Sequence, residues 1–132
     1  MSESFIKGCH HVALVADDFE KSCAFYEALG LVPVVGWGEG DHRIRMFDMG
    51  DGTRLELFAG GSDAYQAEGK YKHLAFAVDD VDAAYTHALS VGAVSLTPPK
   101  SVPLPSTPEA ITIRIAFVLG PSGEQLEFFK EV

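Results

Sequence analysis

The stretch HVALVADDFEKSCAFYEALG, residues 11–30, returns later in the chain as HLAFAVDDVDAAYTHALSVG, residues 73–92. The two copies share a histidine at the start, a pair of aspartates in the middle and a glycine at the end. A second pair of segments follows in the same order, because RIRMFDMGDGTRLELF at 43–58 matches RIAFVLGPSGEQLEFF at 114–129. Self-similarity of this kind indicates that one structural unit occurs twice.

Each copy predicts the element order β-α-β-β-β. An alternating apolar pattern indicates the first strand. The aspartate pair then provides helix caps, and Asp17 and Asp79 are expected as N-caps because an acidic residue follows three positions later. Helical spacing and a terminal glycine follow. Strands are predicted at 10–16, 32–37, 43–49 and 53–59, and again at 72–78, 93–97, 112–118 and 124–130. The modules span 8–59 and 71–131, with a linker at 60–70.

Proline is concentrated in one segment. Residues 97–108 hold five of the seven prolines in the chain. Because proline lacks the N–H that a sheet ladder needs, this segment is expected to be a loop or a poorly paired edge strand. A mobile cover over a site and a plain surface connector are both open roles for it.

Composition excludes several classes of protein. The 132 residues carry 19 acidic and 10 basic side chains, a formal charge of −9, which argues against the basic face of a nucleic-acid binder. No segment approaches the roughly 18 apolar residues of a membrane span, and the N-terminus lacks a signal-peptide pattern. The two cysteines, Cys9 and Cys23, are too few for a disulfide framework. We expect a single cytoplasmic domain with free thiols that contacts neither nucleic acid nor membrane.

Four polar side chains recur at equivalent positions of the two copies. Side chains alternate between the two faces of a strand, so each predicted strand has a bulky apolar face and an opposite face. His11 and His73 share the opposite face with small residues, and Glu56 and Glu127 lie opposite leucine and phenylalanine side chains. The bulky faces are expected to pack under the helices. Both imidazoles and both carboxylates can then converge, whereas alternation places His10 on the other face.

This donor set is typical of a divalent metal site. Imidazole and carboxylate together suit Zn²⁺, Ni²⁺, Co²⁺, Mn²⁺ or Fe²⁺. The absence of cysteine ligands argues against a closed structural zinc site. A metal ion would also partner carboxylates that are costly to bury alone. We predict one divalent ion at His11, Glu56, His73 and Glu127. A site that binds an organic cation or forms ion pairs without metal is the alternative.

The chain resembles the vicinal oxygen chelate superfamily, which includes glyoxalase I, methylmalonyl-CoA epimerase, extradiol dioxygenases and bleomycin resistance proteins. The resemblance runs from HHVALVADDFEKSCAFYEALGL through KHLAFAVDDVDAA to GPSGEQLEFF, nearly the whole chain. It implies a cupped, incompletely closed eight-stranded mixed sheet of α+β class with helices outside. The family ligand positions correspond to the same two histidines and two glutamates. The carboxylate at Glu56 favours the glyoxalase and epimerase branch over the dioxygenases.

Two positions depart from bacterial glyoxalase I. That enzyme carries an arginine on the first strand and an asparagine after the fourth to hold glutathione, where this chain has Val15 and Gly60. The departures argue against glutathione as the substrate. Three arginines are candidates to hold an anionic substrate group instead, and Arg114 is expected to point into the cup. The predicted substrate-binding residues are Arg43, Arg45, Arg114, Trp37, Phe58 and Phe129.

The resemblance implies an activity as well as a fold. A substrate with neighbouring oxygens would chelate the metal, which would stabilise the enediolate formed when a proton leaves carbon. Glu127 is expected to be the base, with Glu56 as the other candidate. The predicted function is a lyase, isomerase or epimerase acting on a small molecule, as a homodimer. Two alternatives stay open: iron-dependent catechol ring cleavage, and non-catalytic binding of an antibiotic or other small molecule.

Overall fold

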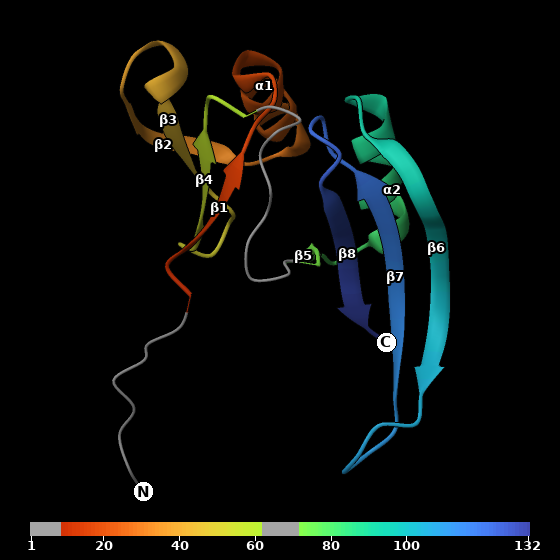
Figure 1. The fold of residues 1–132 in the computed structure, drawn as a ribbon. Helices are drawn as coiled ribbons and strands as arrows, with labels where there is room; N and C mark the ends of the chain where they lie inside the picture. Colours follow the sequence, from red (N-terminus) through yellow and green to blue (C-terminus); the bar gives the residue numbers. More distant parts are fainter. Residues whose placement is uncertain (1–8, 62–71) are drawn as a thin grey trace, which may run out of the picture. The chain divides into compact units, whose positions relative to one another are not determined.

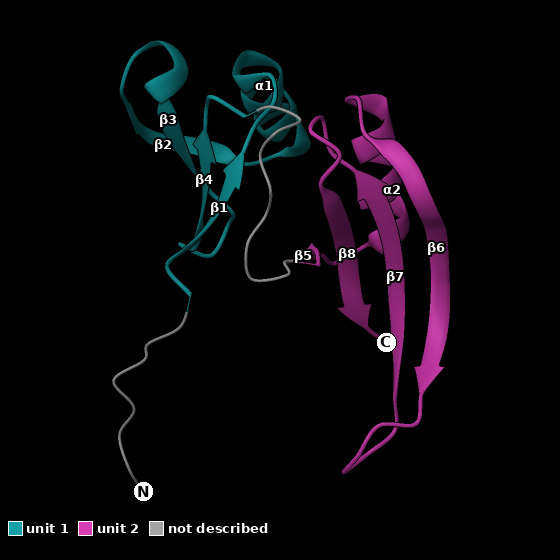
Figure 2. Cartoon of the chain, viewed as in Figure 1, with its two compact units in different colours: residues 1–64 teal, residues 65–132 magenta. Residues whose placement is uncertain are grey.

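The chain divides into two compact units, residues 1–64 and residues 65–132 (Figure 2). The computed structural model describes residues 9–61 and 72–132. Each unit holds one copy of the repeat with the element order β-α-β-β-β, as Figure 1 shows by colour along the chain. The predicted linker at 60–70 lies, from residue 62 onward, outside the described residues.

The first unit contains a four-stranded mixed sheet in the order β1-β4-β3-β2. The pair β1 and β4 is parallel, and the other neighbouring strands are antiparallel. A short 3₁₀ helix, η1, precedes β3. The elements are β1 (His11–Val15), α1 (Phe19–Leu29), β2 (Val32–Trp37), η1 (Gly40–His42), β3 (Ile44–Asp48) and β4 (Arg54–Phe58).

The second unit repeats this topology with the strand order β5-β8-β7-β6. Its single parallel pair, β5 and β8, corresponds to β1 and β4. The elements are β5 (Leu74–Ala77), α2 (Val81–Ser90), β6 (Val94–Leu104), β7 (Ile111–Leu119) and β8 (Gln125–Glu131). The predicted α+β class and the paired βαβββ modules are therefore confirmed. None of the helices in the described part of the chain is suited, by length and hydropathy, to span a membrane.

The helices begin one residue later than the sequence predicted. Asp18 and Asp80 are the N-caps, in place of Asp17 and Asp79. Both caps have extended backbone, and their carboxylates accept hydrogen bonds from Lys21 N at 3.1 Å and Ala83 N at 3.0 Å. A side chain that satisfies one of the free N–H groups of the first turn stabilises the helix. Glu20 and Asp82, the acidic residues three positions after the expected caps, form ion pairs with arginines instead.

The proline segment is mostly strand. β6 runs to Leu104 at the edge of the second sheet, so it includes Pro98, Pro99 and Pro103. Its pairing with β7 is irregular between Ser95 and Lys100, where the Pro-Pro dipeptide removes two ladder donors. Of the two predicted forms, the edge strand is the one observed over residues 97–104, but it is poorly paired only up to Lys100, because Lys100 to Leu104 pair with β7 in continuous register.

The hydrophobic core lies between each helix and its own sheet. α1 packs on β4, and α2 packs on β6, β7 and β8. Leu55 and Leu57 of β4, and Leu126 and Phe128 of β8, are buried on the helix-facing side. Both cysteines are free thiols, and burial raises the pKa of the one at position 23, on α1. Since the bulky apolar faces pack under the helices, the opposite face of each sheet is available for polar side chains.

Candidate functional site

Each unit brings one predicted histidine next to one predicted glutamate. In the parallel pair of the first unit, Ala13 is the partner of Glu56, and His11 lies two residues earlier on the same strand. In the second unit, Ala75 is the partner of Glu127, and His73 lies two residues before it. In β1 a two-residue step returns to the same face, and His73, which directly precedes β5, contacts Glu127 in the same way. The duplicated sequence therefore builds the same half-site twice.

The side chains meet in both half-sites. His11 Nε2 lies 3.5 Å from Glu56 Oε1, and His73 Nε2 lies 3.1 Å from Glu127 Oε1. Two ligands held by one ion at bond lengths of about 2.1 Å would lie roughly 3.0–3.4 Å apart. The nitrogen and oxygen of each pair already have nearly this separation, so the donors fit a shared cation.

The carboxylates are more buried than the imidazoles. The Glu56 and Glu127 side chains are 12 % and 9 % exposed, whereas those of His11 and His73 are 41 % and 28 % exposed. Glu127 is the one charged residue that is buried in the described ranges. A buried carboxylate needs a positive or hydrogen-bonding partner, and in each unit the neighbouring histidine is one. In each pair the carboxylate is the more buried partner and the imidazole the more exposed one, so an ion from solvent could reach the pair from the imidazole side.

Within the described ranges, each unit brings together two of the four predicted metal ligands. No group of three or more His, Cys, Asp or Glu side chains is assembled there in a way that would hold a metal ion. Each unit by itself thus provides two ligands.

Hydrophobic neighbours of the glutamates were not predicted from the sequence. Phe117 of β7 is the cross-strand partner of Glu127, and its ring meets the His73 ring edge-on at 5.1 Å. Met46 of β3 has the equivalent place beside Glu56. The positions of Phe117 and Met46 follow from the register between neighbouring strands, which the apolar pattern of a single strand does not predict. They make the surroundings of each carboxylate apolar on the β3 or β7 side.

His10 also departs from the prediction. Because it precedes β1, strict alternation does not apply to it, and its ring lies against His11 instead of on the other face. The two Nδ1 atoms are 3.0 Å apart. His11 thus has a separate neighbour at each ring nitrogen.

The predicted orientation of Arg114 is wrong. Its Nε and Nη2 donate to the two carboxylate oxygens of Asp82 on α2, at 2.6 and 2.7 Å, and Nη1 donates to Ser101 Oγ at 3.0 Å. Arg114 therefore lies on the helix side of its sheet. Ile113, Ile115 and Phe117 take the side of Glu127 instead. The prediction failed because alternation groups side chains by face but does not say which face of β7 meets the helix.

Arg43 lies in the equivalent ion pair of the first unit. Its guanidinium contacts Glu20 of α1, donates through Nε to Gly40 O at 2.9 Å, and stacks over the Phe19 ring. Arg45 shares this side of the sheet, because it is the partner of the buried Leu57. The structure does not bring these two arginines to the His11–Glu56 pair. Instead they line a separate pocket of about 310 Å³ with Phe19, Gly36, Trp37, Gly38 and Ile44.

Phe58 and Phe129 lie on the glutamate side of the sheets, and Trp37, which is in register with Phe58 through Ile44, also lines the arginine pocket. Phe58 is two residues from Glu56 on β4 and pairs with Ile44, which in turn pairs with Trp37. Phe129 has the corresponding place after Glu127 on β8. The Trp37 side chain is on the edge strand β2 and is half exposed. These positions suit apolar walls beside the half-sites.

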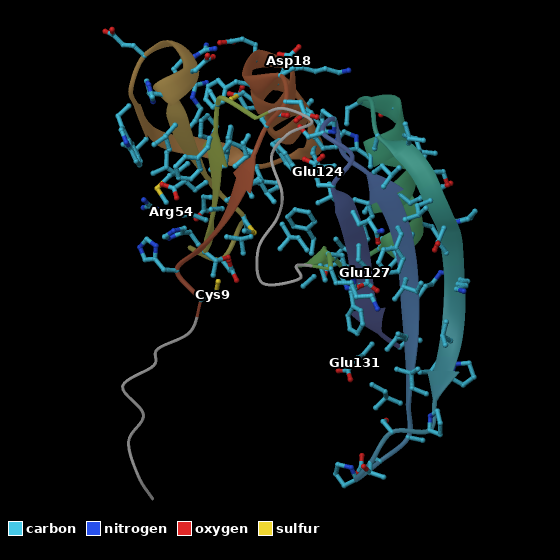
Figure 3. All side chains as sticks on the ribbon, viewed as in Figure 1. Cys9, Asp18, Arg54, Glu124, Glu127 and Glu131 are labelled. Atoms are coloured by element: carbon cyan, nitrogen blue, oxygen red, sulfur yellow. The ribbon has the colours of Figure 1, made fainter. Side chains whose placement is uncertain are left out.

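One guanidinium that the sequence did not single out is better placed than the three predicted ones. Arg54 is the partner of His11 in the parallel register and lies two residues from Glu56, on the same face. It is partly exposed, and Figure 3 labels it beside β4. A cation in this position can attract an anionic group.

Comparisons with known proteins agree with the fold. "Uncharacterized protein YwbC" of Bacillus subtilis (strain 168) is 30 % identical over 129 residues, which cover 94 % of this chain and 98 % of that protein. The glyoxalase family protein from Enterococcus faecalis has a TM-score of 0.71 at 24 % identity and covers 96 % of this chain and 100 % of its own. TnmS3, described as an antibiotic binding protein from Streptomyces sp. CB03234, has a TM-score of 0.73 at 22 % identity, covering 98 % and 100 %.

A family model matches residues 8–128, which include both units and all four predicted ligands. Its description names two kinds of enzyme and a resistance protein. The match covers nearly the whole chain. The protein therefore belongs to the Glyoxalase/Bleomycin resistance protein/Dioxygenase superfamily.

Proposed function

We propose that this protein is a divalent-metal-dependent enzyme of the glyoxalase type, which removes a proton next to a carbonyl group of a small molecule. The repeated His–Glu pair is the observation that carries this proposal. Family membership is compatible with several activities. The two pairs, with nitrogen–oxygen separations of 3.5 and 3.1 Å, are what favour a metal-dependent one.

In this proposal the two half-sites hold one ion together, through His11, Glu56, His73 and Glu127. Imidazole nitrogen and carboxylate oxygen suit Zn²⁺, Ni²⁺, Co²⁺, Mn²⁺ or Fe²⁺. When bound, such an ion would supply Lewis-acid chemistry, stabilising negative charge on a carbonyl oxygen. A substrate oxygen next to the ion would gain from this stabilisation. A homodimer is part of the proposal by resemblance to the family.

Glu127 is proposed as the base that takes the proton from carbon. It is the more buried carboxylate, and Phe117 and Ala75 flank it through the strand register. Such apolar neighbours limit access of water to a carboxylate, which favours proton transfer from a bound substrate. Glu56 is the more exposed carboxylate and keeps the role of ligand. Arg54 would attract an anionic group on the substrate, and Phe58 and Phe129 would contact its apolar part.

The test begins with protein purified without chelators and analysed for bound metal. The metal is then removed, and each candidate ion is added back before assays with hemithioacetals of several thiols and with a catechol. We expect proton-transfer activity that depends on the added ion. Oxygen uptake with the catechol and Fe²⁺ would instead establish ring cleavage. Turnover unaffected by removal of metal would reject the proposal.

A second candidate is non-catalytic binding of a small molecule such as an antibiotic. The structural similarity to TnmS3, at a TM-score of 0.73, favours it. This function predicts tight binding without turnover and tolerance of His11→Ala. The enzymatic proposal predicts that His11→Ala weakens metal binding and lowers activity. Measuring ligand affinity and metal content on the same variant separates the two.

A further inference from the structure

The edge strand β2 leaves its apolar side chains uncovered in the first unit. β2 is the outermost strand of the first sheet (Figure 1), and all six of its residues are exposed. In the described part of this unit, the large apolar side chains that are exposed all belong to β2. They are 45–60 % exposed and are Val32, Val34, Val35 and Trp37. Apolar side chains that gather on one surface strand, instead of lying scattered, indicate a binding site.

A cation without a partner lies beside this strand. Arg45 of β3 is in register with Gly36 of β2, and its guanidinium has neither an ion pair nor a hydrogen bond among the described residues. Arg43 differs, because its Nε donates to Gly40 O and its Nη1 contacts the Glu20 carboxylate. In a chain with a formal charge of −9, Arg45 is thus a positive group that is free to pair with an anion.

Arg45 lines two pockets at once. The arginine pocket, of about 310 Å³, includes Arg45 and Trp37. A second pocket, of about 210 Å³, includes Arg45, Val34 and Val35. Gly36 lines both pockets, and a Cβ there would lie 3.7 Å from Arg45 Nε, so the missing side chain leaves this edge of the guanidinium open. The guanidinium therefore has accessible apolar surface on either side of it.

We infer that this surface of β2 and β3 binds a small organic monocarboxylate, whose carboxylate pairs with Arg45 and whose flat apolar part packs on Trp37. A guanidinium forms two parallel hydrogen bonds with a carboxylate, and the half-exposed indole offers a face for a ring. The larger pocket is at the lower end of the range of about 300–1,000 Å³ that is typical of small-molecule sites. Because Glu20 already neutralises Arg43, the pocket matches one negative charge, which favours a carboxylate over a dianionic phosphate ester.

The inference goes beyond the proposed function, because Arg45 and Glu56 lie on opposite faces of the first sheet. Arg45 is in register with the buried Leu57, whose side faces the helix, whereas Glu56 is on the other face. The second unit lacks the cation. Ala116 has the place of Arg45 in the repeat and is fully buried. The carboxylate site therefore belongs to the first unit alone.

The experiment uses the fluorescence of Trp37, which is the one tryptophan of the chain and lines the pocket. The full chain is titrated with phenylacetate, with phenylacetamide as the uncharged probe and with phenyl phosphate as the dianionic one. Phenylacetate should bind saturably, with a Kd of about 1 mM or tighter, and more tightly than either other probe. Arg45→Gln should weaken phenylacetate binding at least about 10-fold. Lys100→Gln, which removes an exposed cation from the edge strand of the second sheet, should leave it unchanged.

Three results of this titration would overturn the inference. They are equal affinity for phenylacetate and phenylacetamide, unaltered affinity in Arg45→Gln, and tighter binding of phenyl phosphate than of phenylacetate. The titration is then repeated with zinc present, which should not change the affinity. Phenylacetate binding that requires zinc would assign the carboxylate to a metal ion and would also overturn the inference. If zinc does not bind at all, the proposed function fails, while the titration without zinc still decides the role of Arg45.

Contact between two copies of the chain is the competing explanation for the exposed valines of β2. Val35→Glu separates the two, because it places a carboxylate on the strand beside Arg45. We expect this variant to bind phenylacetate more weakly and to keep the oligomeric state of the wild type, measured by sedimentation. A dimer that Val35→Glu converts into monomers, in a protein that does not bind phenylacetate, would assign β2 to a contact between copies and overturn the inference.

Discussion

The two units share a framework but differ around their half-sites. The framework includes an ion pair that fastens each helix to its sheet, Arg43 to Glu20 in the first unit and Arg114 to Asp82 in the second. These four residues occupy equivalent positions of the repeat. The repeated arginine therefore belongs to the structure of the module, although its recurrence made it look like part of the site.

The half-sites diverge in burial and in their neighbours. In the second unit the histidine and glutamate lie closer together and are less exposed, and an aromatic ring packs on the histidine. In the first unit the histidine is more exposed and contacts a second histidine. Under the proposed function, the second unit would provide the less exposed base and the first unit the more accessible ligand. The predictions below test this division, from the largest expected effect to the smallest.

Glu127→Gln should have the largest effect. Removing a general base lowers turnover by about 10²–10⁴-fold. The matched change in the first unit, Glu56→Gln, should lower metal affinity more than it lowers turnover of the metal-saturated protein. Steady-state kinetics at saturating metal, with metal content measured on the same samples, separates the two effects. A larger loss of turnover in Glu56→Gln would assign the base to the first unit.

Core substitutions should affect both units alike. Leu55 and Leu126 are equivalent and fully buried, so Leu55→Ala and Leu126→Ala should each lower the free energy of unfolding by about 2–5 kcal/mol. Val32 and Val94 are equivalent, exposed residues on the edge strands of the two sheets. Changing either to alanine should alter the free energy of unfolding by less than about 0.5 kcal/mol. Urea denaturation gives the free energy of unfolding of all four variants and of the wild type. A loss confined to one leucine would show that the two cores do not contribute equally.

The helix caps distinguish the observed N-caps from the predicted ones. Asp18→Ala and Asp80→Ala should each lower the free energy of unfolding by about 1 kcal/mol, because a helix N–H loses its partner. Asp79→Ala is the control, since the hydrogen bond that Asp79 forms with another described residue, Lys130, is accepted by its backbone carbonyl from Lys130 Nζ and not by its carboxylate. Thermal unfolding of the three variants and the wild type under the same conditions gives the melting temperatures to compare. A larger shift in Asp79→Ala than in Asp80→Ala would restore the cap predicted from the sequence.

The smallest effect is a pH dependence. The hydrogen bond from Arg114 lowers the pKa of the Asp82 carboxyl below its ordinary value of 3.8. A carboxyl with a lower pKa in the folded state stabilises the protein above its unfolded pKa, and this contribution disappears as pH falls through the folded pKa. The melting temperature of Asp82→Asn should thus lie below that of wild type at neutral pH, and the gap should close below about pH 4. A gap that is constant from pH 7 to pH 3 would contradict this.

Much of the fold followed from the sequence because the module is duplicated. The first strand, the helix and the three later strands each recur with the same apolar period, so each copy supported the other. The His–Glu pairs were also predictable, because two histidines and two glutamates recur opposite bulky apolar residues. Long-range information was missing. Neither the packing of Phe117 on His73 nor the contact of Arg114 with α2 follows from local pattern, because both depend on strand register and on which face meets the helix.

The most direct test of the shared metal centre is the zinc-binding isotherm of the wild-type protein, His11→Ala and His73→Ala, measured under one set of conditions. If both half-sites hold one ion, wild type binds one zinc per chain, and each substitution weakens that single event. Two ions per chain in the wild type, or one variant that binds its ion with unaltered affinity, would contradict a shared centre.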